Sequence, residues 1–139
     1  METKFRVWCE FEINGQIEKC MESPASWFLL TQVGQLMEYG PMRAPQKPSG
    51  AYKKLIPLFF TGRLDKNGQE IYQGDIVRAV DEMVDKSFIG LVEYFPACCW
   101  FGILIDGIPE RGHLNFKDVN NNIEVIGNIY ENPELLKKG

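Results

Sequence analysis

Hydrophobic and polar residues alternate along the first stretch of the chain, KFRVWCEFEINGQIEKCME at residues 4–22. A period of two is typical of a half-buried β-strand, because successive side chains point to opposite faces of a sheet. The apolar face would carry Phe5, Val7, Cys9, Phe11 and Ile13. Asn14-Gly15 tolerates the positive φ of a tight turn, so we expect the chain to return as the second strand of a hairpin.

The turn decides the register of this hairpin. A two-residue turn pairs Phe11 with Glu18, whereas a three-residue turn ending at Gly15 pairs Phe11 with Ile17. A shift of one residue reverses the face of every side chain in the second strand. We favour the three-residue turn, because it packs apolar side chains against each other.

Residues 23–50 change in character. Ser23-Pro24 offers an N-cap and a proline at the first helical position, and apolar residues then recur at helical spacing from Trp27 to Met37, which predicts one helix. The stretch GPMRAPQKPSG at residues 40–50 combines prolines and basic residues without an acidic one, which predicts an extended loop. We therefore expect residues 1–50 to form a hairpin-helix elaboration followed by a linker.

Short apolar segments separated by turn residues fill the rest of the chain, at the spacing of a small barrel or sandwich. The expected strands are Leu55–Thr61, Asp75–Val80, Phe88–Phe95, Cys99–Asp106, Leu114–Lys117 and Ile123–Tyr130. Asn132-Pro133 then predicts the start of a short C-terminal helix, with Leu135 and Leu136 docked on the barrel. The result is a mainly β, α+β chain whose core is formed by residues 51–139, on their own or within one compact domain.

Composition and apolar run lengths predict where in the cell the protein is located. Of the 139 residues, 45% are hydrophobic and 24% charged, as in a globular protein. The longest apolar runs, Trp27–Leu30 and Leu55–Phe60, are too short to span a bilayer, and the N-terminus lacks the features of a secretion signal. We therefore expect a cytoplasmic protein without a membrane partner. Its net charge of −4 offers no general attraction to nucleic-acid phosphates.

The cysteines do not predict a metal site. Cys9, Cys20, Cys98 and Cys99 lack the paired short spacings of zinc ligands, and His113 is the single histidine. Thiols stay reduced in the cytoplasm, so we expect four free thiols, although a two-residue hairpin turn would place Cys9 opposite Cys20. No metal and no cofactor are expected.

Three stretches resemble the YopX-like family of bacteriophage and prophage proteins. They are FTGRLDKNGQEIYQGDIV at residues 60–77, GLVEY at residues 90–94 and EVIGNIYENPELL at residues 124–136, and the opening KFRVW also matches. The segment from Cys9 to Leu58 has no counterpart in this resemblance. The resemblance implies a phage or mobile-element origin, and hence the cytoplasm of a host cell, but it carries over no reaction and no catalytic residues.

The shared motifs have a structural interpretation. DKNG at residues 65–68 predicts a tight surface turn, in which Asp and Asn bond the local backbone and Gly adopts a positive φ. Five strands after Gly74, with Gly127 at a bend in the last of them, predict an SH3-like small barrel. The motif positions are Gly62, Asp65, Asn67, Gly68, Gly74, Asp75, Gly127 and Asn128.

Two groups of residues are candidates for chemistry. The carboxylates of Asp65, Glu70, Asp75 and Glu93 would suit a metal-dependent hydrolase if they converged, with Asp75 and Glu93 as the candidate catalytic residues. Their spacing does not enforce convergence. His113 has no nucleophile or orienting carboxylate beside it in the sequence.

Aromatic side chains favour binding. Tyr94 and Trp100, beside Arg78 and Arg111, would form a surface for a protein partner or for nucleic-acid bases. We expect a non-enzymatic protein-interaction module whose partner is an unknown host or phage protein. A nucleic-acid-binding module is the alternative, and a metal-dependent hydrolase is the less favoured one. The sequence leaves homo-oligomerisation open and names neither the partner nor the stage of the phage cycle.

Overall fold

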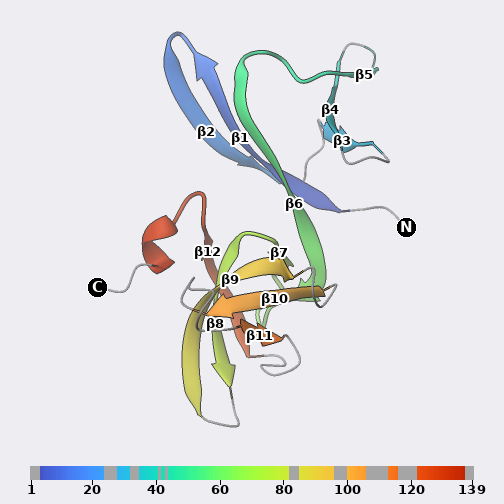
Figure 1. Ribbon diagram of the computed structural model, residues 1–139. Helices are drawn as coiled ribbons and strands as arrows, with labels where there is room; N and C mark the ends of the chain where they lie inside the picture. Colours follow the sequence, from blue (N-terminus) through green and yellow to red (C-terminus); the bar gives the residue numbers. More distant parts are fainter. Residues whose placement is uncertain are drawn as a thin grey trace. The chain divides into compact units, whose positions relative to one another are not determined.

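The computed structural model describes residues 4–23, 28–31, 35–40, 42, 44–81, 85–95, 100–105, 113–115 and 122–136, almost all of them in β-strands and turns (Figure 1). The chain divides into two compact units, Met1–Phe59 and Phe60–Gly139. The division falls within β6 (Tyr52–Leu64), whose first residues pair with β1 and whose last residues pair with β7 (Glu70–Tyr72). The mainly β prediction is confirmed.

A hairpin opens the first unit. β1 (Phe5–Ile13) and β2 (Gln16–Glu22) are joined by Asn14 and Gly15, with φ of 51° and 80°. The turn has two residues, and Phe11 lies opposite Glu18, so the preferred three-residue register is wrong. Two positive φ values give the turn a twist that matches the strands. The three-residue turn would have buried little additional apolar surface, because β2 is exposed from Gln16 to Lys19.

The predicted helix in residues 23–40 is also wrong. β3 (Phe28–Leu30) and β4 (Leu36–Tyr39) are antiparallel strands, and β5 (Pro45–Gln46) completes a three-stranded sheet. The loop between β3 and β4 is closed by the N–H of Thr31 bonding the carbonyl of Gln35 at 2.9 Å. Residues 24–27 and 32–34 lie outside the described part of the chain. Phe28 is only 4% exposed and packs with Val7 and Cys9, so burial against the hairpin outweighs the local helical spacing.

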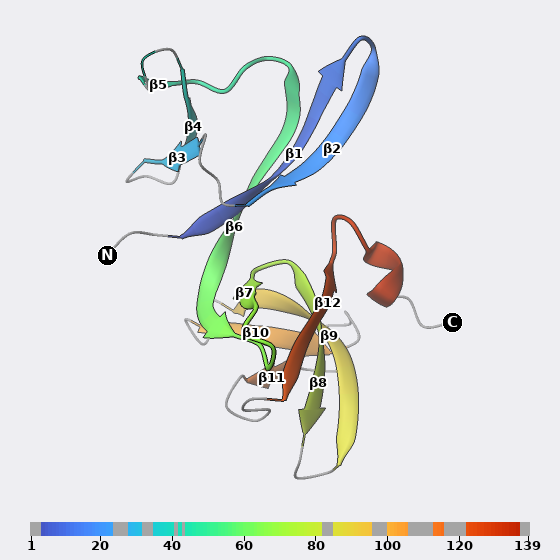
Figure 2. The ribbon, with the colours of Figure 1, turned by 180° about the vertical axis from the view of Figure 1, so that it is seen from behind.

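The second unit holds a curled, five-stranded antiparallel sheet (Figure 2). Its strands are β8 (Asp75–Asp81), β9 (Lys86–Phe95), β10 (Trp100–Ile105), β11 (His113–Asn115) and β12 (Ile123–Asn128). The order is β11-β10-β9-β8-β12, so the last strand pairs with the first. The buried face of this sheet carries Val77, Ala79, Val92, Ile103 and Ile123, which form the core together with Ile71 of β7. Each such aliphatic side chain larger than alanine contributes about 1.5–3 kcal/mol to folding when fully buried.

The end of β12 is bent, as the glycine at position 127 predicted. The register shifts between Val125 and Gly127, which is a β-bulge. A 3-10 helix, η3 (Pro133–Leu136), follows in place of the expected C-terminal helix and packs against β9. The Oδ1 of Asn132 accepts the N–H of Asn128 at 3.3 Å, so this side chain bonds the end of β12. No helix in the described ranges has the length and apolarity to cross a membrane.

Candidate functional site

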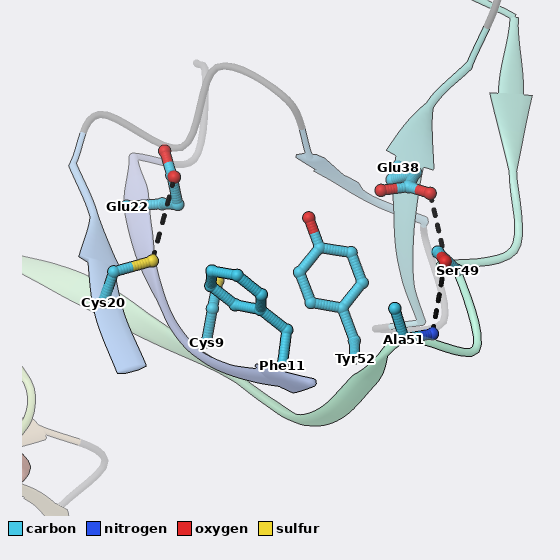
Figure 3. A pocket seen from close by; sticks show the side chains of 8 residues that line it. All are labelled: Cys9, Phe11, Cys20, Glu22, Glu38, Ser49, Ala51 and Tyr52. Atoms are coloured by element: carbon cyan, nitrogen blue, oxygen red, sulfur yellow. Dashed lines mark hydrogen bonds between the residues drawn. The ribbon is translucent and has the colours of Figure 1, made fainter. Parts of the chain in front are cut away.

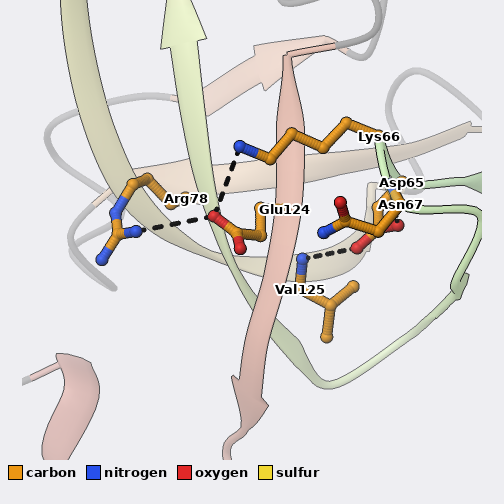
Figure 4. A network of polar contacts seen from close by, with 6 residues as sticks. All are labelled: Asp65, Lys66, Asn67, Arg78, Glu124 and Val125. Carbon is orange, nitrogen blue, oxygen red and sulfur yellow. Dashed lines mark hydrogen bonds and ion pairs between the residues drawn. The ribbon is translucent and has the colours of Figure 1, made fainter.

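Asp65 organises the turn that the shared motif predicted. Its Oδ1 accepts the N–H groups of Asn67 and Gln69 at 2.8 and 2.9 Å, and its Oδ2 accepts the N–H of Val125 at 3.0 Å (Figure 4). Gly68, at a φ of 82°, completes the turn by donating to the carbonyl of Asp65. The carboxylate therefore ties the β6–β7 turn to β12, which is 60 residues away in sequence.

Ionisation of Asp65 follows from these bonds. Burial opposes the charge, but the three backbone N–H donors outweigh it and hold the pKa of Asp65 below its ordinary value. The carboxylate is thus a permanent anion at neutral pH whose lone pairs serve the backbone.

Asp75 and Glu93, the candidate catalytic pair, lie on opposite faces of the sheet. Asp75 is 1% exposed and accepts the N–H of Tyr72 at 2.8 Å. It lies two residues before Val77 on β8, so the two side chains share the core face. Glu93 neighbours the core residue Val92 on β9 and so points the other way. The pleat of the sheet separates the two carboxylates, and they form no dyad.

Glu93 is half-buried, and that burial raises the pKa of its carboxyl. Glu70 is half-buried at the start of β7. Across the described ranges, no three His, Cys, Asp or Glu side chains gather as metal ligands. The four carboxylates singled out in the sequence are therefore distributed and do not converge.

Arg78 belongs to a small charge cluster. Glu124 lies opposite Arg78 on β12. Its Oε2 forms ion pairs with Arg78 Nη1 and with Lys66 Nζ, each at 3.6 Å (Figure 4). The three side chains border a hollow of about 50 Å³, which is too small for more than a water molecule or two. Two cations thus share one carboxylate at the sheet surface.

The two aromatic candidates do not form one platform. Trp100 is 59% exposed and Tyr94 43% exposed. Trp100 pairs with Phe95 and Tyr94 with Phe101, so the two side chains project from opposite faces. The rings of Tyr94 and Phe101 meet edge to face at 5.4 Å. Arg111, Cys98 and Cys99 lie outside the described residues, as does the side chain of His113.

A further hollow lies in the first unit, where the sequence predicted no site. It is a pocket of about 290 Å³ lined by two thiols, two aromatic rings and two carboxylates, Cys9, Cys20, Phe11, Tyr52, Glu22 and Glu38 (Figure 3). Ser49 and Ala51 complete the wall. Cys9 and Cys20 are free thiols directly opposite each other on β1 and β2.

Strand alternation explains how the acidic side chains reach this pocket. Glu22 lies opposite Val7, on the face of the hairpin that also carries Cys9 and Cys20, while Lys19 points to the other face. Glu38 comes from β4, and its Oε1 accepts the backbone N–H of Ser49 at 3.1 Å. In Figure 3 its second oxygen lies on the side of the Tyr52 hydroxyl.

Burial, and to a lesser extent nearby acidic groups, keeps the thiols and the phenol of the pocket protonated. Burial raises the pKa of Cys9 to about 12, with further contributions from Cys20 and Glu22. Burial also raises the pKa of Cys20, assisted by Glu22, and that of Tyr52, assisted by Glu38. In each case the environment disfavours an added negative charge. The thiols are therefore poor nucleophiles here.

The family of the chain follows from a comparison with family models. The model described as "YopX protein" matches residues 4–137. The chain belongs to the YopX family. The match includes the segment from Cys9 to Leu58, so the pocket lies within the part of the chain that the family model covers.

Other comparisons add the fold. The crystal structure of protein EF1440 from Enterococcus faecalis is similar, with a TM-score of 0.50 and 21% identity over 99% of each chain. At this identity the likeness shows the fold alone. None of the curated proteins compared with the chain matches it.

The residues that carry the YopX resemblance lie in turns, at strand ends and at irregular positions within strands. Gly62 and Gly74, like Gly68, have positive φ, at 85° and 88°. Asn128 Oδ1 accepts the N–H groups of Tyr130 and Glu131 at 3.0 and 2.9 Å. These positions build the scaffold of the second unit. The pocket residues carry no such motif, and the hairpin register is the signal that would have brought Cys9 and Cys20 together.

Proposed function

We propose that this YopX-family protein is a non-enzymatic accessory protein of a bacteriophage or prophage, whose second unit is an SH3-like interaction module for a host or phage protein. Trp100 carries the proposal. It is a large aromatic side chain, 59% exposed, on a regular strand of a buried-core sheet. Exposed tryptophans on rigid elements are frequent hot spots of protein interfaces.

The strand order supports the SH3-like part of this proposal. Five strands follow Gly74 in one antiparallel sheet, and the fifth returns to pair with the first. Such a return curls a short sheet into a small barrel. Small barrels of this kind present loops and one sheet face to their ligands.

The surroundings of Trp100 suit a protein better than a nucleic acid. Phe95 and Leu104, half-buried, share its face, and so does Glu93. Arg78 is on this face too, but Glu124 pairs with it at 3.6 Å. A phosphate backbone needs basic side chains free to neutralise it, and Tyr94, the second exposed aromatic candidate, lies on the opposite face.

Trp100→Ala tests the module. Immobilised protein is exposed to lysate of phage-infected cells, and retained proteins are identified and then purified for a binary titration. We expect Trp100→Ala to weaken the partner by about 2 kcal/mol or more, as for a hot spot. Leu64→Ala is the matched control, because Leu64 is 55% exposed in the same unit, and it should bind as the wild type does.

The hydrolase alternative is examined on the same preparations. Asp75→Asn, which lies on the core face, should leave partner affinity unchanged, and the wild type should not cleave nucleic acid in the presence of Mg²⁺. Cleavage that disappears in Asp75→Asn would replace the interaction module by an enzyme. Equal affinities of wild type and Trp100→Ala would remove Trp100 from the interface.

A further inference from the structure

We propose that the pocket of the first unit binds the side chain of an arginine presented by a protein partner, with its guanidinium between the carboxylates of Glu22 and Glu38 and against the rings of Phe11 and Tyr52. This site is separate in residues from the Trp100 surface. It adds a second recognition element to the protein.

The walls of the pocket match the two chemistries of an arginine side chain. Tyr52 is the central ring, edge to face with Phe11 at 6.1 Å and with Phe28 at 5.8 Å. These contacts fix its orientation, and the alkyl stem of arginine packs well on such rings. A guanidinium within about 6 Å of an aromatic ring gains cation–π attraction as well.

The rim supplies acceptors on two sides. Glu22 comes from β2 and Glu38 from β4, and Figure 3 shows them on either side of the Tyr52 ring. The bond from the N–H of Ser49 holds Glu38 in place at 3.1 Å. Guanidinium presents five N–H donors in a planar fork, so it can satisfy acceptors placed around it, whereas lysine offers a compact point charge.

Charge complementarity identifies the sign of the ligand. None of the eight residues lining the pocket is basic, and two are acidic. Burial is the larger cause of the raised pKa of Tyr52, and Glu38 adds Coulombic repulsion. Only this second contribution changes sign for a cation, which the two carboxylates attract.

Size limits the ligand to a small group. The pocket measures about 290 Å³, at the lower end of the about 300 to 1,000 Å³ of pockets for drug-sized molecules. One long side chain fits, while the remainder of a protein partner would rest on the exposed strands around it.

A titration with small probes tests the site directly on the full chain. The probe is N-acetyl-arginine amide, and backbone amide shifts of the ¹⁵N-labelled protein are followed. We expect saturable shifts at Cys20, Ser49, Ala51 and Tyr52. The citrulline counterpart has the same shape without the charge, and its affinity should be lower by a factor of about ten or more.

Variants localise the effect. Glu22→Gln and Glu38→Gln should each weaken the arginine probe by about tenfold, since they keep shape and remove charge. Glu18→Gln is the matched control, because Glu18 is an exposed carboxylate on the same face of β2 that does not line the pocket. Tyr52→Phe removes the hydroxyl group and keeps the ring. It is a control for the aromatic contact and should retain the affinity of the wild type within a few-fold. Trp100→Ala should titrate as the wild type, so this test is independent of the proposed interaction module.

Three results would overturn the assignment. Equal binding of the citrulline probe would show that charge is not recognised. An equal loss in Glu18→Gln would show diffuse attraction to an acidic surface. Tighter binding of propylguanidine, which carries the same single charge but lacks the peptide groups, would assign the pocket to a small metabolite in place of a protein side chain.

Discussion

At the scale of single residues, the clearest feature is Asp65, a buried carboxylate that serves three backbone N–H groups. Two of these donors close its own turn, and the third belongs to β12. A buried acceptor in this position is structural, because removing it leaves donors without partners in a region of low dielectric constant.

We predict that Asp65→Asn lowers the free energy of unfolding by about 1–3 kcal/mol at neutral pH. The asparagine keeps one oxygen acceptor, but its NH₂ group cannot accept the bond from Val125. Urea denaturation of both proteins measures the difference. Asp85→Asn, at an exposed turn position with a φ of 51°, is the control and should be nearly neutral, since Asn tolerates this conformation.

The same pair of proteins has a pH signature. The folded-state pKa of Asp65 lies below its ordinary value of 3.8. The stabilisation is therefore complete above that value and is lost as the pH falls through the folded-state pKa. The stability difference between wild type and Asp65→Asn should shrink on acidification below about pH 4. A difference that stays constant would assign the effect to packing.

At the scale of elements, β12 and η3 are joined by one close approach. A Cβ on Gly127 would lie 2.6 Å from Asn132 Oδ1 and 2.9 Å from Leu135 Cδ1. The bulge at this position brings the strand backbone under the 3-10 turn, and the absence of a side chain lets Leu135 pack there.

We predict that Gly127→Ala destabilises the protein by about 1–3 kcal/mol, because the turn must shift to admit the methyl group. Gly50→Ala is the matched control. A Cβ there meets nothing within 4 Å, so the change should be neutral or stabilise by up to about 1 kcal/mol. Thermal melts compare the two variants. Equal effects would mean that η3 moves aside without cost.

At the scale of the whole molecule, two buried clusters share no described residue. Val92 and its neighbours form the core of the second unit, and Val7, Cys9 and Phe28 form that of the first. The strand β6 contributes residues to both units. Separate cores predict separate local stabilities.

We predict that Val92→Ala, at a fully buried position, costs about 1–3 kcal/mol and accelerates amide hydrogen exchange mainly in β8, β9, β10 and β12. Val7→Ala should do the same mainly in β1 and β2. Exchange measured by mass spectrometry on both variants decides the matter. Uniform acceleration along the chain in either variant would show a single cooperative unit.

The sequence by itself determined the features that depend on neighbours along the chain. Alternation specified the first hairpin, and short apolar segments between turn residues specified most strands of the second unit. Asn14-Gly15, DKNG at residues 65–68 and Gly127 marked the places of turns and a bend, although not the length of the first turn. These signals work locally, because backbone torsion and side-chain bonds within a few residues suffice to establish them. The family motifs are of this kind, which is why the resemblance was recognisable.

Tertiary structure decided what depends on distant contacts. Phe28 is a strand residue because its ring is buried on Val7 and Cys9, although the local spacing from Trp27 to Met37 favours a helix. Strand register decided which faces carry Asp75, Glu93, Tyr94 and Trp100. It places the two carboxylates on opposite faces, and likewise the two aromatic side chains. The acidic pocket draws on β1, β2, β4 and β6 together. No period along the chain encodes such a meeting, because its residues are brought together by burial of apolar surface, which is non-directional and blind to sequence distance.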